Sequence, residues 1–474
     1  MASFRRTKIV CTIGPASESE EMLAALMEAG MDVARLNLSH GTLDQHRQRL
    51  ERLRRLAGGR TPPVAVMVDI QGPKIRLGQL PEPLAVERGM VVVLRAGHQT
   101  EDPRRIIPVA YPTLAEDLRA GQVVYLDDGL VELAVEQVRP PDVVCRVVTP
   151  GTVRSRTGVA LPGVENRLPA LTDTDREHLR FAVQHNVDLV AASFVRRAEH
   201  VQAVREVLRE AGGDIPVIAK LESAQSLEHL EEIVEAADGV MVARGDLGVS
   251  IALEQVPLAQ KEIIRCCNRA GKPVITATQM LESMVHNPRP TRAEAADVAN
   301  AILDGTDAVM LSGETAVGRH PVEAVRTMDR IARAVEARGY DYARWLAESA
   351  RPGPSVAGAI SRAACQSAME LGLAAILCST QSGATARMVA RFRPRAPIIA
   401  ATPNPRVARQ LALVWGVLPV VVPRASNIDG MIDVTLQAAW QTGLVRRGDR
   451  VAVVAGVRTD VPGSTNLLQI YEVP

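Results

Sequence analysis

The chain has 474 residues, of which 47% are hydrophobic and 3% aromatic, and its formal net charge is +1. This length predicts roughly three domains, and the apolar fraction is sufficient for large hydrophobic cores. The nearly neutral charge and the scarcity of aromatic rings argue against a nucleic acid or a membrane surface as partner.

The apolar segments are too short for insertion into a membrane. No apolar run approaches the roughly 20 residues of a membrane span. The N-terminal segment leads into a short strand and Gly14-Pro15, without the long apolar region of a signal peptide. The six cysteines are scattered and form no C-x-x-C pair, which is typical of reduced proteins. These features predict a cytoplasmic protein.

Apolar strands alternate with amphipathic helices from residue 8 to about residue 340. The predicted strands are, in chain order, Lys8–Ile13, Asp32–Leu38, Val64–Ile70, Asp188–Phe194, Val217–Glu222, Gly239–Ala243, Pro273–Thr278 and Ala308–Ser312. Helix patterns follow nearly all of them, among them Glu20–Glu28, Gln225–Ala236, Pro257–Arg269 and Thr291–Leu303. Eight strand–helix units in succession indicate a (β/α)8 TIM barrel.

One insertion interrupts this alternation after the third strand, beginning at Gly72-Pro73. Valine-rich runs at Met90–Leu94, Val123–Leu126, Val131–Val138 and Val143–Val148 are separated by turn residues, which indicates an all-β insertion. The helix start at Thr172-Asp173 marks the return to the barrel. An insertion after a barrel strand emerges at the face where barrel enzymes place their active sites, so we expect a lid.

A third unit follows residue 340. Helix patterns at Val356–Leu371, Ala384–Arg391, Arg406–Leu413 and Met431–Gln441 alternate with apolar runs at Ala375–Ser379, Pro397–Ala401, Leu418–Val422 and Arg450–Val454. This alternation predicts an open α/β sheet. The predicted domains are therefore a catalytic barrel (1–72 and 168–340), an all-β lid (73–167) and a C-terminal α/β effector-binding domain (341–474).

Charged side chains end two neighbouring barrel strands. Lys220 and Glu222 are two residues apart in one strand and so project from the same face, and Asp246 is expected at the end of the next strand. Two carboxylates suit Mg²⁺ or Mn²⁺, and the ammonium group can stabilise a developing oxyanion. A buried structural ion pair is the alternative, but such a pair does not require a second acid.

Other strand ends add polar groups to the same face. Arg35, Asn37 and Ser39 share one face of the second strand and together fit a phosphate, with a solvated strand edge as the alternative. Thr276 and Thr278 end the seventh strand, and either hydroxyl group can donate to a substrate.

The third strand ends in Asp69, a further carboxylate at the top of the barrel, and Lys74 and Arg76 bring positive charge to the hinge of the insertion. Neither a Walker A motif nor G-x-G-x-x-G occurs. A bound nucleotide would therefore be held by side chains and a metal ion.

A possible phosphate site lies in the C-terminal unit. Thr380, Ser382, Gly383 and Thr385 fall between a strand and a helix. Hydroxyl groups and a glycine at a helix N-terminus suit a phosphate. An ordinary capped helix start explains the same residues.

Taken together, these segments resemble pyruvate kinase. The matching runs are Lys8–Pro15, Ala34–Gly41, Gly158–Gly163, Lys220–Ser223, Met241–Val249, Ala277–Met284, Met310–Ala316 and Arg391–Pro397. They span all three predicted domains in order. The resemblance implies a barrel, a β lid and a C-terminal effector domain, assembled in most of the family as a homotetramer.

The resemblance also implies a reaction and a set of residue roles. Phosphoenolpyruvate would transfer its phosphoryl group to ADP, giving pyruvate and ATP, and phosphoryl transfer depends mainly on positioning and charge neutralisation. The implied assignments are Mg²⁺ on Glu222 and Asp246, Lys220 beside the transferring phosphoryl group and the enolate oxygen, Gly245, Asp246 and Thr278 at the substrate carboxylate, Arg35 at the phosphoryl group, and Arg76, Asn37 and His40 on the nucleotide side. The resemblance does not decide whether Thr278 or a water network donates the proton to enolpyruvate.

The hinge sequence departs from the family pattern. The common pattern is D-T-K-G-P-E-I-R-T, whereas this chain has D-I-Q-G-P-K-I-R-L, with Lys74 in place of the glutamate. The family usually requires K⁺, held by the residues that match Asn37, Ser39, Asp69 and the backbone of Ile70. A tethered ammonium group can replace the free cation, so the resemblance to the K⁺-independent branch implies activity without K⁺. Lys74 as an unselected hinge charge is the alternative.

The effector loop departs too. Gln381 and Ala384 stand where fructose-bisphosphate-regulated relatives carry Lys and Arg. The hydroxyl groups remain, so a singly phosphorylated effector, such as AMP or a sugar monophosphate, fits better than a bisphosphate. The sequence itself does not identify the effector, the cooperativity or the assembly.

Two other functions compete with this interpretation. A Mg²⁺-dependent lyase or aldolase acting on pyruvate enolate would need no nucleotide, and Arg35, Arg76 and the lid argue against it. A non-catalytic metabolite sensor would need a damaged metal site, and none is visible in the sequence.

Overall fold

The computed structural model describes residues 4–100, 102, 106–164, 167–348, 355–456 and 465–473. Eight parallel strands close into a barrel in the order β1-β16-β15-β14-β13-β12-β3-β2. Their bounds are β1 (Lys8–Thr12), β2 (Val33–Asn37), β3 (Ala65–Asp69), β12 (Leu189–Ala192), β13 (Val217–Leu221), β14 (Gly239–Ala243), β15 (Val274–Ala277) and β16 (Ala308–Leu311). The predicted barrel and all of its strands are confirmed, with slightly shorter strand ends.

Amphipathic helices surround the barrel and cover its outer apolar face. The long ones are α1 (Glu20–Ala29), α2 (Leu43–Ala57), α4 (Asp173–Gln184), α5 (Ala198–Glu210), α9 (Val256–Ala270), α10 (Arg292–Leu303) and α12 (Pro321–Arg338). Thr42, Thr172 and Thr291 start three of them as capping boxes. The predicted helix Gln225–Ala236 is wrong as a single element: His229, with φ −110° and ψ 23°, separates α6 (Ala224–Glu228) from α7 (Leu230–Ala236).

Short helices complete the loops of the barrel. They are α8 (Arg244–Ser250), α11 (Gly313–Ala316) and the 3₁₀ turns η1 (Leu253–Gln255) and η2 (Glu282–Val285). The barrel interior is filled by side chains such as Val10, Met67, Met241 and Met310, so the barrel is a packed core rather than a pore.

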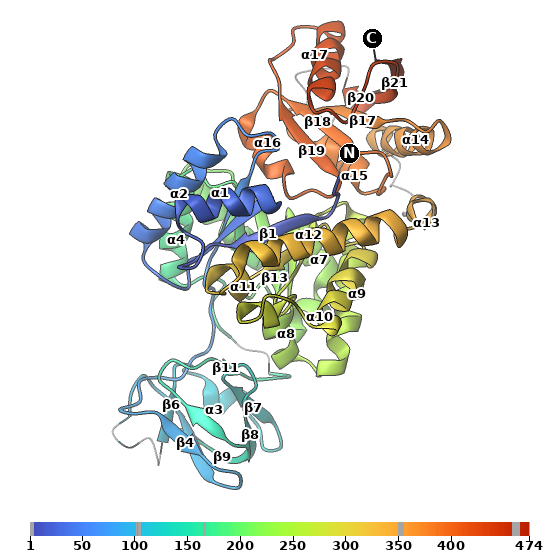
Figure 1. Cartoon of the computed structure of the whole chain (residues 1–474). Coiled ribbons are helices and arrows are strands. Elements are labelled where there is room, and N and C mark those ends of the chain that lie inside the picture. The colour runs from blue at the N-terminus through green and yellow to red at the C-terminus, as the bar shows by residue number, and fades with distance from the viewer. Residues whose placement is uncertain are drawn as a thin grey trace.

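The insertion after β3 is almost entirely β structure, as predicted. It contains β4 (Leu84–Val86), β5 (Val91–Ala96), β6 (Ile106–Val109), the short helix α3 (Leu114–Asp117), β7 (Val123–Leu126), β8 (Val131–Arg139), β9 (Asp142–Thr149), β10 (Gly151–Val153) and β11 (Val159–Ala160). Six of these strands form one sheet and β4 and β10 form a second. The insertion has its own hydrophobic core and lies at one end of the barrel, opposite the C-terminal unit (Figure 1).

The C-terminal unit is the predicted open sheet, with strand order β19-β18-β17-β20-β21. Its elements are α13 (Tyr342–Glu348), α14 (Val356–Glu370), β17 (Ala375–Ser379), α15 (Ala384–Ala390), β18 (Ile398–Thr402), α16 (Pro405–Leu411), β19 (Val417–Val421), α17 (Ile428–Gln441), β20 (Arg450–Gly456) and β21 (Thr465–Glu472). The sequence interpretation missed β21, which pairs antiparallel with β20. Such an edge strand is half exposed and lacks the continuous apolar run of a buried parallel strand.

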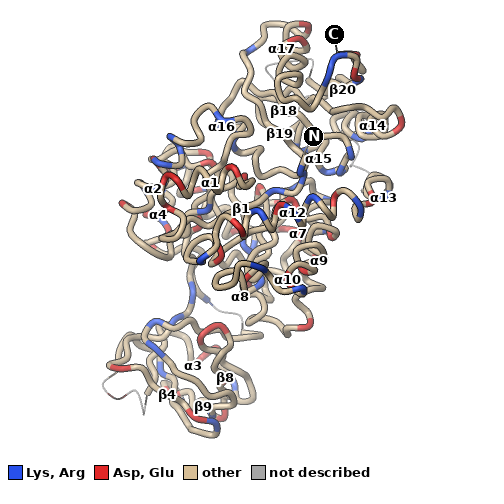
Figure 2. Tube along the Cα trace, viewed as in Figure 1, with Lys and Arg blue, Asp and Glu red and all other residues tan. Residues whose placement is uncertain are grey.

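The charges are well mixed over the chain, with Lys and Arg interspersed among Asp and Glu in every part (Figure 2). All six cysteines are buried and free. Within the described ranges, no helix has the length and apolar character that crossing a membrane requires.

A buried ion pair joins the barrel to the C-terminal unit. The guanidinium group of Arg393, 1% exposed, donates to both carboxylate oxygens of Asp307 at 3.0 and 2.9 Å. It also donates to Asn268 Oδ1 at 2.6 Å and lies 4.9 Å from the ring centroid of Trp415. The pair closes the N-terminal end of the barrel, because Asp307 immediately precedes β16.

We expect Arg393→Met to cost about 3–5 kcal/mol of stability, because it leaves the Asp307 carboxylate buried without its cation. Thermal and urea unfolding of the two proteins measure this loss. Arg395→Met, which removes an exposed guanidinium group two residues away, is the matched control. Equal stability of the Arg393 variant and the control would contradict a structural role for the pair.

Candidate active site

A cavity of about 340 Å³ lies between the top of the barrel and the insertion. The barrel contributes Glu222 and Asp246, the hinge contributes Lys74, and the insertion contributes Asp128 and Gly158. The C-terminal ends of the barrel strands therefore face the insertion, as expected for a lid.

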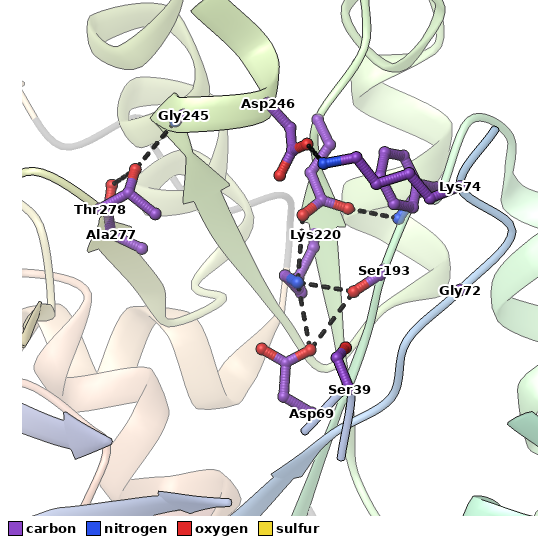
Figure 3. A network of polar contacts seen from close by, with 12 residues as sticks. Ser39, Asp69, Gly72, Lys74, Ser193, Lys220, Gly245, Asp246, Ala277 and Thr278 are labelled. Carbon is purple, nitrogen blue, oxygen red and sulfur yellow. Dashed lines mark hydrogen bonds and ion pairs between the residues drawn. The ribbon is translucent and has the colours of Figure 1, made fainter. Parts of the chain in front are cut away.

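Lys220 is the centre of a buried polar cluster at the top of the barrel (Figure 3). Its ammonium nitrogen lies 3.0 Å from Glu222 Oε1 and 3.1 Å from Asp69 Oδ1, and donates to Ser193 Oγ at 2.6 Å. The three charged residues are between 1 and 8% exposed. Lys220 and Glu222 do project together, which confirms the prediction from their spacing.

The cluster holds Asp69 and Lys220 in their charged forms. Burial opposes the ionisation of Asp69, but Lys220 and Arg35 outweigh it and lower the pKa of that carboxyl group. Burial likewise opposes the charge of Lys220, but Asp69 and Glu222 outweigh it and raise the pKa of the ammonium group. The site therefore retains an ammonium group despite its burial.

Glu222 behaves differently from Asp69. Burial raises its pKa to about 7, and although Lys220 opposes this shift, the nearby Asp246 reinforces it. The other carboxylate oxygen of Glu222 accepts a hydrogen bond from the backbone N–H of Phe194 at 2.5 Å. A carboxyl group in this setting gains from a further positive partner, which is the electrostatic property of a cation ligand.

Asp246 is not at a strand end, which corrects the sequence prediction. Strand β14 ends at Ala243, and Asp246 lies in the first turn of α8, which begins at Arg244. The helix N-terminus stabilises a carboxylate there. The position still brings Asp246 close enough to Glu222 to raise the pKa of Glu222.

Lys74, at the hinge of the insertion, pairs with two carboxylates. Its ammonium nitrogen is 2.7 Å from Asp246 Oδ1 and 3.2 Å from Asp128 Oδ1 of the insertion. Burial opposes its charge, but these two carboxylates outweigh it and raise the pKa of Lys74. A partly buried ammonium group is stabilised when it pairs with nearby carboxylates. Because its two partners belong to different parts of the chain, Lys74 links the insertion to the barrel.

The residues predicted to hold a monovalent cation have other partners. Asp69 pairs with Arg35 and Lys220, and the carbonyl oxygen of Ile70 accepts from Ser193 Oγ at 2.8 Å. Asn37 Oδ1 accepts from the backbone N–H of Ser39 at 3.2 Å. Lys74 contacts Asp246 and Asp128 instead of these residues, and the replacement of K⁺ by its ammonium group stays a prediction.

Arg35 belongs to the buried cluster, whereas the predicted nucleotide residues lie apart from it. Arg35 is 2.7 Å from Asp69 Oδ2 and donates to Thr12 Oγ1 at 2.9 Å. Arg76 donates to the carbonyl oxygen of Arg156 in the insertion at 3.1 Å. His40 contacts His46 through its own carbonyl oxygen, at 2.7 Å.

The structure distinguishes Thr276, which lies in β15, from Thr278, which follows the strand. Thr276 is fully buried and donates to Thr306 Oγ1 at 3.0 Å, away from the site. Thr278 has φ +68°, which is strained for a β-branched residue and is typical of functional sites. Its hydroxyl group accepts from the backbone N–H of Gly245 at 2.9 Å, so Thr278 and the start of α8 lie side by side.

Sequence reasoning missed Ser193 and Phe194. Ser193 Oγ contacts Lys220 and Asp69, and the backbone N–H of Phe194, a residue with φ +55°, orients Glu222. Both follow β12. A polar residue at the end of an apolar run was the available signal, the same signal that pointed to Lys220.

In the predicted effector loop Thr380 and Thr385 turn their hydroxyl groups inward, whereas Ser382 lines a cavity between the barrel and the C-terminal unit. Thr380 Oγ1 accepts from the backbone N–H of Gly383 at 3.0 Å, and the hydroxyl groups of Thr385 and Thr465 are 2.8 Å apart. Thr380 and Thr385 are 7 and 6% exposed. The N-cap residue of α15 is Gly383, which has no side chain to cap the helix, so the Thr380 hydroxyl group closes the turn before the helix.

Comparison with known proteins points to one family. The profile described as "Pyruvate kinase, barrel domain" matches residues 4–325, and "Pyruvate kinase, alpha/beta domain" matches residues 358–471. Proteins named "Pyruvate kinase" from Staphylococcus epidermidis and Staphylococcus aureus are each 46% identical over 472 residues, covering 99% of this chain and 80% of theirs.

Proposed function

This chain belongs to the pyruvate kinase family and is a phosphotransferase of glycolysis, and on that premise we propose which of its residues transfer the phosphoryl group of phosphoenolpyruvate to ADP. The observation that carries the assignment is the buried ammonium group of Lys220, 3.0 Å from Glu222 at the top of the barrel. A coupled assay of pyruvate formation, with Mg²⁺ as the only added metal, tests the reaction with and without ADP. Pyruvate formation that needs no ADP would favour the lyase alternative.

The donor set fits a hard divalent ion. Among the described residues no group of three or more His, Cys, Asp or Glu side chains converges as a metal cage, but Glu222 and Asp246 line one cavity. Two carboxylates leave coordination positions for substrate oxygens and water, as Mg²⁺ prefers. Glu222 and Asp246 would hold Mg²⁺ or Mn²⁺, and the bound ion would supply positive charge beside the transferring group.

Lys220 supplies the second positive charge. In the proposed role its ammonium group neutralises the transferring phosphoryl group and the enolate oxygen, and Asp69, Glu222 and Ser193 hold it in position. Arg35, fixed by Asp69, binds the phosphoryl group. Such fixed cations neutralise charge without reorganising during the reaction.

The substrate carboxylate would lie at the start of α8. The proposed donors are the backbone N–H groups of Gly245 and Asp246 and the hydroxyl group of Thr278. In the structure the Gly245 N–H donates to Thr278 Oγ1 and Thr278 Oγ1 donates to the carbonyl oxygen of Ala277, so both groups would exchange these partners for the substrate. The strained backbone of Thr278 supports this role, because strain persists where surrounding contacts impose it. Either Thr278 or a water network would donate the proton to enolpyruvate.

The nucleotide would bind on the lid side. Arg76, Asn37 and His40 are proposed to contact ADP, although these three side chains do not line the cavity between Glu222 and the lid. A lid that moves relative to the barrel would bring Arg76 nearer, since Arg76 pairs with Gly158 of the insertion in an isolated β-bridge.

Activity without K⁺ is proposed on the charge of Lys74. Its ammonium group lies in the cavity and contacts Asp246, so a permanent positive charge is present where relatives with glutamate lack one. This proposal depends on the charge and not on the monovalent-cation position that the sequence predicted.

The remaining features are proposed with the family as their basis. They comprise the domain boundaries given above, cytoplasmic location, assembly as a homotetramer, and regulation by AMP or a sugar monophosphate through Thr380, Ser382, Gly383 and Thr385. Sedimentation velocity tests the assembly, and titration of apparent KM against each candidate effector tests the regulation.

We expect Glu222→Gln to raise the Mg²⁺ concentration for half-maximal activity about tenfold or more, because the amide removes one anionic oxygen ligand. A Mg²⁺ titration at saturating substrates measures the change. Glu228→Gln, at the exposed edge of the same cavity, is the matched control. An unchanged Mg²⁺ requirement in the Glu222 variant would contradict the metal assignment.

A further inference from the structure

Arg244, the first residue of α8, extends its side chain to the loop that follows β15. Its Nη2 donates to the carbonyl oxygen of Thr278 at 2.6 Å, and its Nε donates to the carbonyl oxygens of Ala277 and Thr278, both at 3.3 Å. The side chain is 11% exposed. No role proposed above uses Arg244, and Arg244 does not line the cavity around Glu222.

The loop that accepts these hydrogen bonds has a strained backbone. Thr278 and the following Gln279 both have positive φ, +68° and +53°. The left-handed region is unfavourable for residues other than glycine, and such a conformation persists only where the surroundings impose it. A guanidinium group that donates from two of its nitrogens to two successive carbonyl oxygens of the loop is such a constraint.

The third nitrogen of the guanidinium group anchors it to two helices. Nη1 lies 2.8 Å from the carboxylate of Asp297 in α10 and donates to Gln260 Oε1 of α9 at 3.3 Å. Gln260 is itself buried. Because the donors of a guanidinium group form a rigid planar fork, the pair with Asp297 on one edge fixes where the other edge points. Arg244 therefore links α9 and α10 to the loop after β15.

A backbone hydrogen bond runs beside these side-chain contacts. The N–H of Gly245, the residue after Arg244, donates to Thr278 Oγ1 at 2.9 Å (Figure 3). The donors proposed for the substrate carboxylate therefore lie on the two segments that Arg244 joins. A Cβ atom added at Gly245 would meet Thr278 only at 3.8 Å, an ordinary van der Waals distance. Hydrogen bonds, more than close packing, thus hold the two segments together.

We propose that Arg244 is a positioning residue for the substrate, because its guanidinium group sets the position of the Thr278 hydroxyl group relative to the start of α8. The inference rests on the carboxylate site proposed above and adds to it the residue that assembles that site. Each of the three guanidinium nitrogens already has a partner in the protein, so Arg244 would act through the loop and not by touching the substrate. An error of about 1 Å in such a donor set is enough to weaken binding strongly.

Steady-state kinetics of Arg244→Met and Arg244→Lys test the proposal, with KM measured separately for phosphoenolpyruvate and for ADP. We expect KM for phosphoenolpyruvate to rise about tenfold to a hundredfold in Arg244→Met. The rise should be smaller in Arg244→Lys, because lysine keeps a charge for Asp297 but lacks the fork. KM for ADP should stay within about twofold of the wild type. A residue needed only for folding would lower the Tm and the active fraction and would leave both KM values unchanged.

A double-mutant cycle with Thr278→Val shows whether Arg244 acts through this loop. If it does, Arg244→Met should add little to the rise in KM for phosphoenolpyruvate that Thr278→Val already causes, because the effects of coupled residues are not additive. Effects that multiply independently would overturn the proposal. An unchanged KM for phosphoenolpyruvate in Thr278→Val would refute the carboxylate site itself, and the role of Arg244 would fall with it.

Arg54→Met is the matched control. Arg54 also pairs with an aspartate, Asp188 at 2.8 Å, and donates to a backbone carbonyl oxygen, that of Asn186 at 3.0 Å, but at the N-terminal end of the barrel. It should leave KM for phosphoenolpyruvate at the wild-type value. An unchanged KM in Arg244→Met, or a rise no larger than in the control, would overturn the proposal. Thermal unfolding shows which variants fold, and Arg244→Lys decides the outcome if Arg244→Met does not.

Discussion

Lys220→Met is expected to lower kcat about a hundredfold to a thousandfold, the cost of removing one well-placed electrostatic donor. The ammonium group is 8% exposed and lies 3.0 Å from Glu222, and within the described ranges no other ion pair reaches that carboxylate. Methionine keeps most of the side-chain volume and removes the charge. Steady-state kinetics with phosphoenolpyruvate and ADP measure the loss, which should appear in kcat more than in KM.

A folding defect has to be separated from this loss. The substitution leaves Asp69 with Arg35 at 2.7 Å, but it leaves Glu222 without its ammonium partner, and an unpaired buried acid protonates more readily. Thermal unfolding and the Mg²⁺ requirement should therefore be measured beside kcat. Lys261→Met, an exposed lysine-to-methionine change, controls for the substitution itself. Near-normal turnover of a folded Lys220 variant would refute the assignment.

Lys74→Glu is expected to make the proposed K⁺-independent activity depend on K⁺, so that K⁺ activates the variant about a hundredfold. The change replaces an ammonium group by a carboxylate and so alters the local charge by two, next to Asp246 and Asp128. At separations near 4 Å, each such charge pair is worth on the order of 1–4 kcal/mol in water-like to surface-like surroundings. A free cation would then be required to restore the balance.

The assay uses buffers free of K⁺ and NH₄⁺, with K⁺ then added to the wild type and to each variant. Lys74→Met removes the charge without adding a carboxylate and should fall between the two in its response. Asp128→Asn tests whether the contact with the lid contributes, since Asp128 is the lid partner of Lys74. Hundredfold activation of the wild type by K⁺ would contradict the proposed independence.

The charges around the cavity show why these two lysines have large expected effects. Arg35 and Lys220 pair with Asp69 and Glu222, and Lys74 pairs with Asp246 and with Asp128 of the insertion. Three cations therefore face four carboxyl groups, of which Asp128 is exposed. Removing or reversing one of the cations therefore leaves unpaired negative charge in a largely buried site, where solvent does not compensate it.

Periodicity in the sequence was enough to predict the barrel, the insertion and the C-terminal sheet. Buried parallel strands must be nearly continuous apolar runs because both of their faces are covered, so the strands from Lys8 to Leu311 were recognisable one by one. The geometry of a single strand also placed Lys220 and Glu222 on one face, because successive side chains point to opposite faces and those two positions apart point to the same face. Strand β21 was not predicted because it lies at a half-exposed edge of the sheet.

Only the tertiary structure decided what the charged groups contact. The sequence placed Lys74 at the hinge, but its partners, Asp128 and Asp246, lie 54 and 172 residues away. Ser193 and Phe194 likewise join Lys220 and Glu222 only once β12 and β13 lie side by side. Side-chain periodicity is a property of one element, whereas a long flexible side chain takes whichever partner the packing of distant elements brings within reach.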